Sequence, residues 1–383
     1  MNTRSTIAFL CLLACLQPFN AAANAGKFNR KPSIEQPNYA AFMADLQLNM
    51  NQGNTDLFEQ SFYTLPIENK LRRRLHMNDA VLHQLKSDLR TSIDAMADKI
   101  VQGQIKILRV VPSASKQAKM LIRLDYGTDG LMYVQFDIME INNTLRIVDW
   151  LNHSTGMTLS DTLEQLYTLQ NSLPQEQAKS LNQLYLSVNS NQYADALATL
   201  KRLPKSLQNN PFVMLLKTEA SAVDETLYMQ ALAEFAVRFG RDERYTWIMV
   251  DHYYYQQDFG TAHKLLDAFA NRVIRDAAIY AIQGSFAYVN TDYAGAIRFC
   301  RIAMKLDPDY RDTYLTLLYA LIANHNFQEA VLVLEVLQQR FSFKLDPMML
   351  ASFDGFDDFA KSEPFLDWAQ KTLDNTLETG SLP

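Results

Sequence analysis

The sequence is poor in the residues that build metal centres, disulfide frameworks and phosphate-binding loops. It contains 3 cysteines, 6 histidines and 12 glycines among 383 residues. The histidines are scattered without metal-ligand spacing, and the glycines form no loop of the type that cradles a nucleotide phosphate. We therefore expect neither a metal ion nor any other cofactor.

Positive charge is scarce as well. The formal net charge is -6 at pH 7, and the basic run between Lys70 and Arg74 is short enough to be the solvated face of a helix. We therefore expect no nucleic-acid partner. Hydrophobic residues make up 48% of the chain and charged residues 20%, which is typical of a folded protein, and the length favours two domains.

Beyond residue 25 the sequence has no apolar run long enough for a transmembrane helix. The first 25 residues differ, because Arg4 precedes an apolar run from Ile7 to Leu16 and the tripeptide Ala-Asn-Ala stands before Gly26. This order is typical of a cleaved signal peptide. We expect residues 1–25 to be removed and the mature protein, starting at Gly26, to be exported to a bacterial periplasm.

A second interpretation of the leader remains open, because Leu12-Leu13-Ala14-Cys15 resembles a bacterial lipobox. In that case Cys15 becomes the first residue, carries a lipid and anchors the protein to a membrane. Membrane contact is expected only under this interpretation. Cleavage before Gly26 leaves Cys300 as the only cysteine, so the mature chain forms no internal disulfide.

The pattern changes twice in the following part of the chain. Residues 26–37 contain two prolines and few apolar side chains, which predicts a flexible lead-in. Helical spacing of apolar residues then begins at residue 38, with Asn78 or Asp79 placed to cap the longest helix. Strand-length runs separated by turn signals follow at residues 105–112, 118–126, 131–140 and 145–153. The sequence therefore predicts helices packed against a four-stranded antiparallel meander, an α+β domain over residues 38–165.

This order of helices and meander, ending in "IVDW" and "STGMTLSDTLEQLY", resembles the cystatin-like roll also seen in nuclear transport factor two. Some proteins of that fold use a cavity for a small ligand or for acid/base catalysis, so a ligand-binding or enzymatic roll is our alternative hypothesis. The candidates are Asp125, Tyr126, Tyr133, Asp137 and Asp149. Asp137 and Asp149 alternate with apolar residues, as solvent-facing strand positions do, and this pattern favours no catalytic role.

A pattern of about 34 residues repeats between residues 166 and 350. In "AAIYAIQGSFAYVNTDYAGAIRFCRIAMKLDP", counting Ala277 as position 1 puts Gly284 at position 8, Ala296 at 20 and Pro308 at 32. Steps of about the same length reach an alanine at position 20 in each of about five units, namely Ala196, Ala231, Ala262, Ala296 and Ala330. The pattern resembles the tetratricopeptide repeat (TPR).

The resemblance implies two antiparallel helices per unit. Small residues at positions 8 and 20 let the helices approach closely, and Cys300, at interior position 24, is expected to pack as a small apolar residue. Because no unit buries its apolar face alone, the units are expected to stack into an all-α TPR-type solenoid, and residues 351–383 to form a capping helix and tail.

In TPR proteins, positions 2, 5, 9, 12 and 13 of the first helix line a concave groove that binds partners. The matching candidates for partner binding are Arg244, Trp247, Asp251, Tyr254, Tyr255, Ser285, Tyr288 and Tyr319. Aromatic rings with a few polar groups are typical of a peptide- or protein-binding surface. We therefore expect a non-catalytic scaffold or adaptor of the bacterial cell envelope that binds a protein or peptide.

Overall fold

The computed structural model describes residues 38–379, except residues 115, 128, 129 and 354. The signal peptide and lead-in expected over residues 1–37, Cys15 included, lie outside the described residues, as do residues 380–383. The chain divides after Tyr255 into two compact units, residues 38–255 and 256–379 of the described part. None of the helices described is long and apolar enough to cross a membrane.

The first unit begins with helices that match the predicted helical pattern. They are α2 (Tyr39–Asn51), α3 (Asp56–Ser61), α4 (Leu65–Leu75) and α5 (Asp79–Gln102). The side chain of Asn78 accepts a hydrogen bond from the backbone N–H of Val81 and so caps α5. Asp88 and Ser92 are buried on α5 beside its apolar residues, although their polarity gave no sign of burial.

The predicted meander is confirmed, with one additional strand. The strands are β1 (Gln104–Ala114), β2 (Gln117–Asp125), β3 (Leu131–Ile141), β4 (Thr144–Asn152) and β5 (Met157–Thr158). They are antiparallel and lie in the order β1-β2-β3-β4-β5. The fifth strand has two residues, too few for an alternating pattern to predict it.

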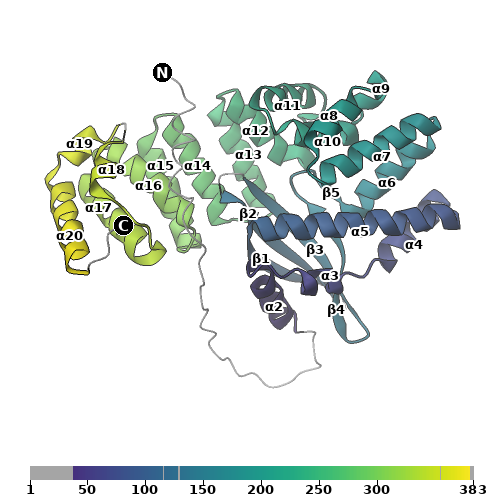
Figure 1. Ribbon diagram of the computed structural model, residues 1–383, viewed down its shortest axis with the longest axis horizontal. Helices are drawn as coiled ribbons and strands as arrows, with labels where there is room; N and C mark the ends of the chain where they lie inside the picture. Colours follow the sequence, from purple (N-terminus) through teal and green to yellow (C-terminus); the bar gives the residue numbers. More distant parts are fainter. Residues whose placement is uncertain (1–37, 115, 128–129, 354, 380–383) are drawn as a thin grey trace. The chain divides into compact units, whose positions relative to one another are not determined.

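Both faces of the sheet are covered within the first unit. On one face the ring of Phe136 in β3 contacts that of Phe58 in α3, with centroids 5.7 Å apart, and α5 crosses the sheet in Figure 1. Tyr133 is displaced from Phe136 by an odd number of residues and therefore points to the other face. There its ring meets that of Trp247, edge to face, at 5.3 Å.

After β5 the described chain is helical. The first unit continues with α6 (Leu159–Asn171), α7 (Gln175–Asn189), α8 (Tyr193–Leu200), α9 (Lys205–Gln208), α10 (Pro211–Ser221), α11 (Glu225–Phe239), the 3-10 helix η2 (Glu243–Tyr245) and α12 (Thr246–Tyr255). The second unit contains α13 (Phe259–Arg272), α14 (Ala277–Val289), α15 (Tyr293–Leu306), α16 (Arg311–Ala323), α17 (Phe327–Phe341), α18 (Pro347–Ala351), α19 (Asp357–Ala360) and α20 (Glu363–Thr379). The predicted order, an α+β roll followed by an all-α solenoid, is confirmed.

The same turn recurs between paired helices. Its middle residue is Asn191, Gln257, Thr291 or His325, each with a positive φ between 56° and 60°. In the turn at Thr291, the backbone N–H groups of Thr291 and Asp292 donate to the carbonyls of Tyr288 and Ala287. The turns at Asn191 and His325 repeat this pair of hydrogen bonds. All four residues fall at position 15 of the sequence pattern, so the local backbone repeats with the period of the sequence.

Helices α14 and α15 approach closely at the small residues. A Cβ atom built on Gly284 would lie 2.9 Å from Sγ of Cys300 and 3.4 Å from the carbonyl oxygen of Ala296. Cys300 and Ala296 are fully buried. Burial also raises the pKa of the Cys300 thiol to about 12, so the side chain stays protonated and packs as a small apolar group.

The C-terminal helices cover the last helix pair. Phe365 and Trp368 of α20 are buried in the same apolar cluster as Leu334 and Leu337 of α17. The indole N–H of Trp368 donates to the side-chain oxygen of Gln338 at 3.2 Å. The cap thus combines apolar burial with one directional contact.

We predict that Gly284→Ala lowers the free energy of unfolding by about 1–2 kcal/mol, because the added methyl group collides with Cys300. Urea denaturation followed by circular dichroism measures the change. Gly260→Ala is the matched control, since a Cβ there lies 3.7 Å from its nearest contact, Oδ1 of Asp258, and it should be neutral or slightly stabilising. Adding Cys300→Ala should recover part of the Gly284→Ala loss; an uncompensated double variant contradicts this packing.

Candidate functional site

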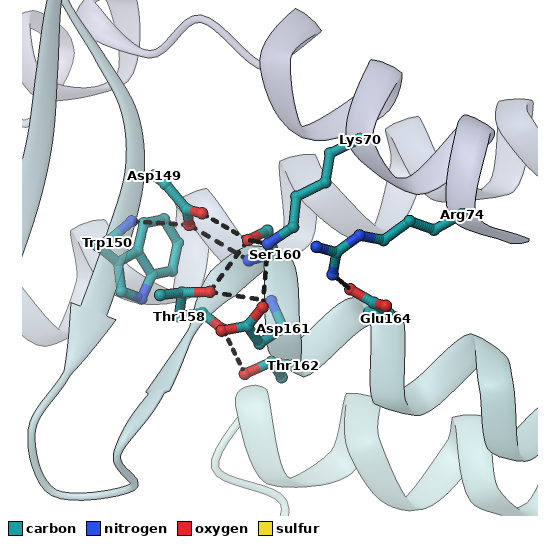
Figure 2. A network of polar contacts seen from close by, with 9 residues as sticks. All are labelled: Lys70, Arg74, Asp149, Trp150, Thr158, Ser160, Asp161, Thr162 and Glu164. Atoms are coloured by element: carbon teal, nitrogen blue, oxygen red, sulfur yellow. Dashed lines mark hydrogen bonds and ion pairs between the residues drawn. The ribbon is translucent and has the colours of Figure 1, made fainter.

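A polar network links α4, β4 and the start of α6 in the first unit (Figure 2). The hydroxyl of Ser160 donates to Oδ2 of Asp149 at 2.6 Å, and the backbone N–H groups of Trp150 and Ser160 donate to Oδ1 of Asp149. From α4, the ammonium group of Lys70 donates to Oγ of Ser160 at 2.7 Å and to Oδ1 of Asp161 at 3.0 Å. Three elements are therefore held together through one hydroxyl group.

This network is structural. A lysine beside a serine can activate a nucleophile, but Ser160 is 0% exposed, lines neither of the two cavities described below, and already donates its hydroxyl hydrogen to Asp149. Asp149 was predicted to face solvent; it is instead partly buried, because the start of α6 folds over it. Burial raises the pKa of Asp149, and the hydrogen bonds from Ser160 offset part of that effect.

The other catalytic candidates of the roll make separate contacts. Asp137 pairs with Lys119 across the exposed strands at 3.1 Å. Asp125 accepts the backbone N–H of Gly127 within its turn. Tyr133 lies buried under Trp247, and burial raises the pKa of Tyr126 to about 12. Asp137, Asp125 and Tyr133 thus have partners within the fold, whereas the buried hydroxyl of Tyr126 has no hydrogen-bond partner among the described residues.

A cavity of about 110 Å³ lies in the first unit between α5, the β4–α6 region, α7 and α10. Its lining includes an ion pair, in which the ammonium group of Lys99 lies 2.7 Å from Oε1 of Glu219. The charge of Glu219 raises the pKa of Lys99 and so favours the charged form of its ammonium group. The remaining wall is mixed, with the hydrogen-bonded Ser92 and Tyr185 among apolar residues. The cavity accommodates a few waters or a very small molecule.

Arg244 and Trp247, both predicted to bind a partner, lie next to the sheet of their own unit. The guanidinium group of Arg244 pairs with Asp242 at 2.5 Å. A Cβ atom on Gly156, just after β4, would lie 2.6 Å from the carbonyl oxygen of Arg244. Trp247 and the main chain at Arg244 therefore pack within the unit, whereas the side chain of Arg244 is 61% exposed.

The predicted residues Asp251, Tyr254 and Tyr255 gather around a residue that the prediction missed. The phenol of Tyr228 donates to Oδ2 of Asp251 at 2.7 Å, and its ring lies 5.9 Å from that of Tyr255. Tyr255 in turn contacts Tyr254 at 5.4 Å. Burial raises the pKa of Asp251 to about 6, and the hydrogen bond from Tyr228 opposes the shift.

The three predicted residues of the second unit lie on consecutive first helices. The hydroxyl of Ser285 in α14 is hydrogen-bonded to that of Thr316 in α16, at 3.1 Å. Tyr288 and Tyr319, on the same two helices, have ring centroids 6.2 Å apart and both line a cavity of about 280 Å³. The structure therefore brings two predicted partner-binding residues to one cavity.

Four further tyrosine and phenylalanine rings line this cavity, together with the imidazole of His325, and the prediction included none of them. The neighbouring ring centroids are 5.6 Å apart for Tyr293–Tyr288, 5.3 Å for Tyr319–Phe356, 6.0 Å for Phe356–Phe359 and 5.6 Å for Phe359–Phe327. With Tyr288–Tyr319 these pairs form a continuous chain of six rings, and we call the cavity they line the aromatic pocket. Phe356 and Phe359 come from the C-terminal cap, where their three-residue spacing was the available signal.

The hydroxyl group of Tyr319 distinguishes the aromatic pocket from an ordinary apolar gap. Tyr319 is 8% exposed, and its hydroxyl oxygen is buried with no hydrogen-bond partner among the described residues. A buried polar group left unpaired costs about 1–3 kcal/mol. Burial raises the pKa of Tyr319 to about 12, so the hydroxyl is neutral at physiological pH. The aromatic pocket thus offers apolar ring faces and one unmatched hydroxyl group.

Metal chemistry finds no support in the part of the chain that the structure describes. No group of three or more histidine, cysteine, aspartate or glutamate side chains comes close enough there to hold an ion.

We predict that Ser160→Ala destabilises the first unit by about 1–3 kcal/mol, because it leaves Lys70 and Asp149 without their shared hydroxyl. Arg74→Ala is the control, since it breaks a nearby but more exposed pair with Glu164 and should cost under about 1 kcal/mol. Urea unfolding followed by tryptophan fluorescence compares the two variants. Equal losses would contradict a special role for the hydroxyl of Ser160.

The raised pKa of Asp251 predicts a pH dependence of stability. Between the usual aspartate pKa near 4 and about 6, the folded state binds more protons than the unfolded state, so stability falls as the pH rises through this range. Asp251→Asn keeps an acceptor for Tyr228 but does not ionise. We expect it to be more stable than the unmodified protein by about 1–2 kcal/mol at pH 8, after allowing for solvent screening, and to lose this advantage near pH 4. Thermal unfolding across this pH range measures the effect, and a constant difference contradicts it.

A scan of the chain against protein-family models finds no match, and no curated protein matches it in sequence. The function is therefore inferred from the residues of the chain itself. The aromatic pocket is the candidate functional site, because it combines a cavity, six rings and a buried hydroxyl group without a partner in the described chain.

Proposed function

We propose that this protein is a non-catalytic scaffold or adaptor that binds a peptide or protein partner through the aromatic pocket. The observation that carries the proposal is the position of Tyr288 and Tyr319. They occupy groove positions on the first helices of two consecutive repeat units, and both line the pocket. Tyrosine and phenylalanine rings in a partly enclosed pocket provide the kind of anchor that dominates binding energy at protein interfaces.

The helical array is proposed to be of the TPR type. Its support is the turn that recurs at position 15 and the close approach of helices at Gly284 and Ala296. TPR-like arrays typically use the inner face of their first helices to bind an extended or helical segment. In this protein that face includes the Ser285, Tyr288 and Tyr319 positions.

The cellular location is proposed from the leader sequence. Residues 1–25 favour export to the periplasm, and the lipobox-like residues ending at Cys15 favour a membrane-anchored form of the same exported protein. In either form the scaffold would serve the bacterial cell envelope.

A second candidate function is small-ligand binding in the first unit. It is favoured by the Lys99–Glu219 pair at the wall of the cavity of about 110 Å³. This volume is far below the about 300–1,000 Å³ of ordinary ligand sites, so peptide binding remains our first choice.

The proposal predicts that Tyr288→Ala/Phe327→Ala weakens partner binding by at least about tenfold, because two anchor rings are lost. The partner is first identified by cross-linking the full chain in envelope extracts, and its affinity is then measured with purified components. Tyr280→Ala/Phe299→Ala is the matched control, since both rings are partly buried in the same unit but do not line the pocket. It should bind within about twofold of the unmodified chain.

Unchanged affinity in a folded pocket variant would exclude the aromatic pocket as the binding site. Trp247→Ala tests the first unit separately. Because Trp247 packs on Tyr133, we expect this change to lower stability and to leave affinity for the partner unchanged.

A further inference from the structure

We propose that the aromatic pocket receives a primary ammonium group, the side chain of a lysine in the bound partner. This inference rests on the function proposed above and specifies the chemistry of its anchor.

The six rings provide the first argument. Each ring face carries partial negative charge, and a cation within about 6 Å of several faces is attracted by all of them. The pocket is lined by a continuous chain of these rings, in which Phe356 and Phe359 are almost fully buried by the protein around them. Attraction between a cation and ring faces strengthens where a bound side chain displaces water from them.

The charges around the pocket provide the second argument. Asp358 and the imidazole of His325 lie on its wall, whereas no lysine or arginine does so among the described residues. The C-terminal segment that supplies Phe356 and Phe359 is acidic, since its described side chains between residues 346 and 374 include six acidic and two basic groups. An anion would be repelled by this segment, whereas a basic partner would be attracted to it.

The hydroxyl group of Tyr319 identifies the kind of cation. A primary ammonium group has three N–H donors, and the phenol oxygen of Tyr319 can accept one of them. A quaternary ammonium ion has no donor and would leave the phenol oxygen unpaired. The carboxylate of Asp358 offers a second acceptor to a primary ammonium group, from the more exposed side of the pocket.

The size of the pocket agrees with a single side chain. Its volume of about 280 Å³ is at the lower limit for sites that enclose a small molecule. A long, flexible lysine chain reaches into such a space while its backbone stays on the surface of the repeats.

The test titrates the full chain with Nα-acetyl-lysine methylamide and follows binding by saturation-transfer NMR. We expect weak, saturable binding. The Nε-acetylated form of the probe lacks the charge and should bind at least about tenfold more weakly. Tetramethylammonium should also bind more weakly than the lysine probe, because it has no donor for Tyr319.

Two pairs of variants assign the contacts. Tyr319→Phe should weaken the lysine probe by about five- to tenfold and leave tetramethylammonium unchanged, without loss of thermal stability, because it removes a hydroxyl that has no partner in the described chain. Its control, Tyr280→Phe, should change neither affinity. Asp358→Asn should weaken the lysine probe by about threefold or more, and Asp357→Asn, an equally exposed neighbour outside the pocket lining, should have a smaller effect.

Three results would overturn the inference: no binding of the lysine probe, equal binding of its acetylated form, or tighter binding of tetramethylammonium that is insensitive to Tyr319→Phe. The proposed function is tested separately, by the affinity for the partner. If partner affinity still depends on Tyr288 and Phe327 when the lysine probe fails, only the choice of a lysine is wrong. If partner affinity is also unchanged, the pocket is not the binding site.

Discussion

A stack of helical repeats must end, and the apolar face of its last helix pair must be covered there. In this chain α16 and α17 present that face, and the C-terminal segment buries Phe359, Phe365 and Trp368 against it. The aromatic pocket exists because the same segment also reaches α16, where Phe356 contacts Tyr319. The same packing of the C-terminal segment therefore buries the terminal apolar face and forms the candidate site.

The aromatic pocket combines stable packing with a buried hydroxyl group, that of Tyr319, which has no hydrogen-bond partner in the described chain. Most residues around the pocket belong to the core of the second unit, so their positions are fixed by burial. The hydroxyl of Tyr319 is carried into this core without a partner in the described chain, at a cost that a phenylalanine would avoid. Other polar atoms of this unit, such as Oγ1 of Thr313, are also buried without a hydrogen-bond partner, but among the described residues Tyr319 is the one of them that lines a cavity. The polar network at Ser160 differs in this respect, because its groups satisfy one another.

Local patterns in the sequence predicted the helices and strands, which depend mainly on neighbouring residues. The alanines at position 20 predicted the helix pairs, and branched and aromatic runs predicted the main strands. Contacts between residues far apart in the sequence could not be predicted. Nothing near Trp247 indicates that Tyr133, more than a hundred residues earlier, would pack against it. Tyr288 and Tyr319 could be selected by their repeat positions, but Phe356 and Phe359 could not, because the cap lies outside the repeating pattern. Asp149 was predicted to face solvent, but the start of α6 covers it, and the alternation of residues within β4 does not reveal this contact.

The absence of glycine from these repeated turns affects the free energy of folding. Asn191, Gln257, Thr291 and His325 adopt left-handed backbone angles that glycine would adopt without steric cost. Each therefore strains the folded chain slightly. A glycine in the same place would widen the set of conformations open to the unfolded chain. These four turns thus exchange a small enthalpic strain for a smaller loss of conformational entropy on folding.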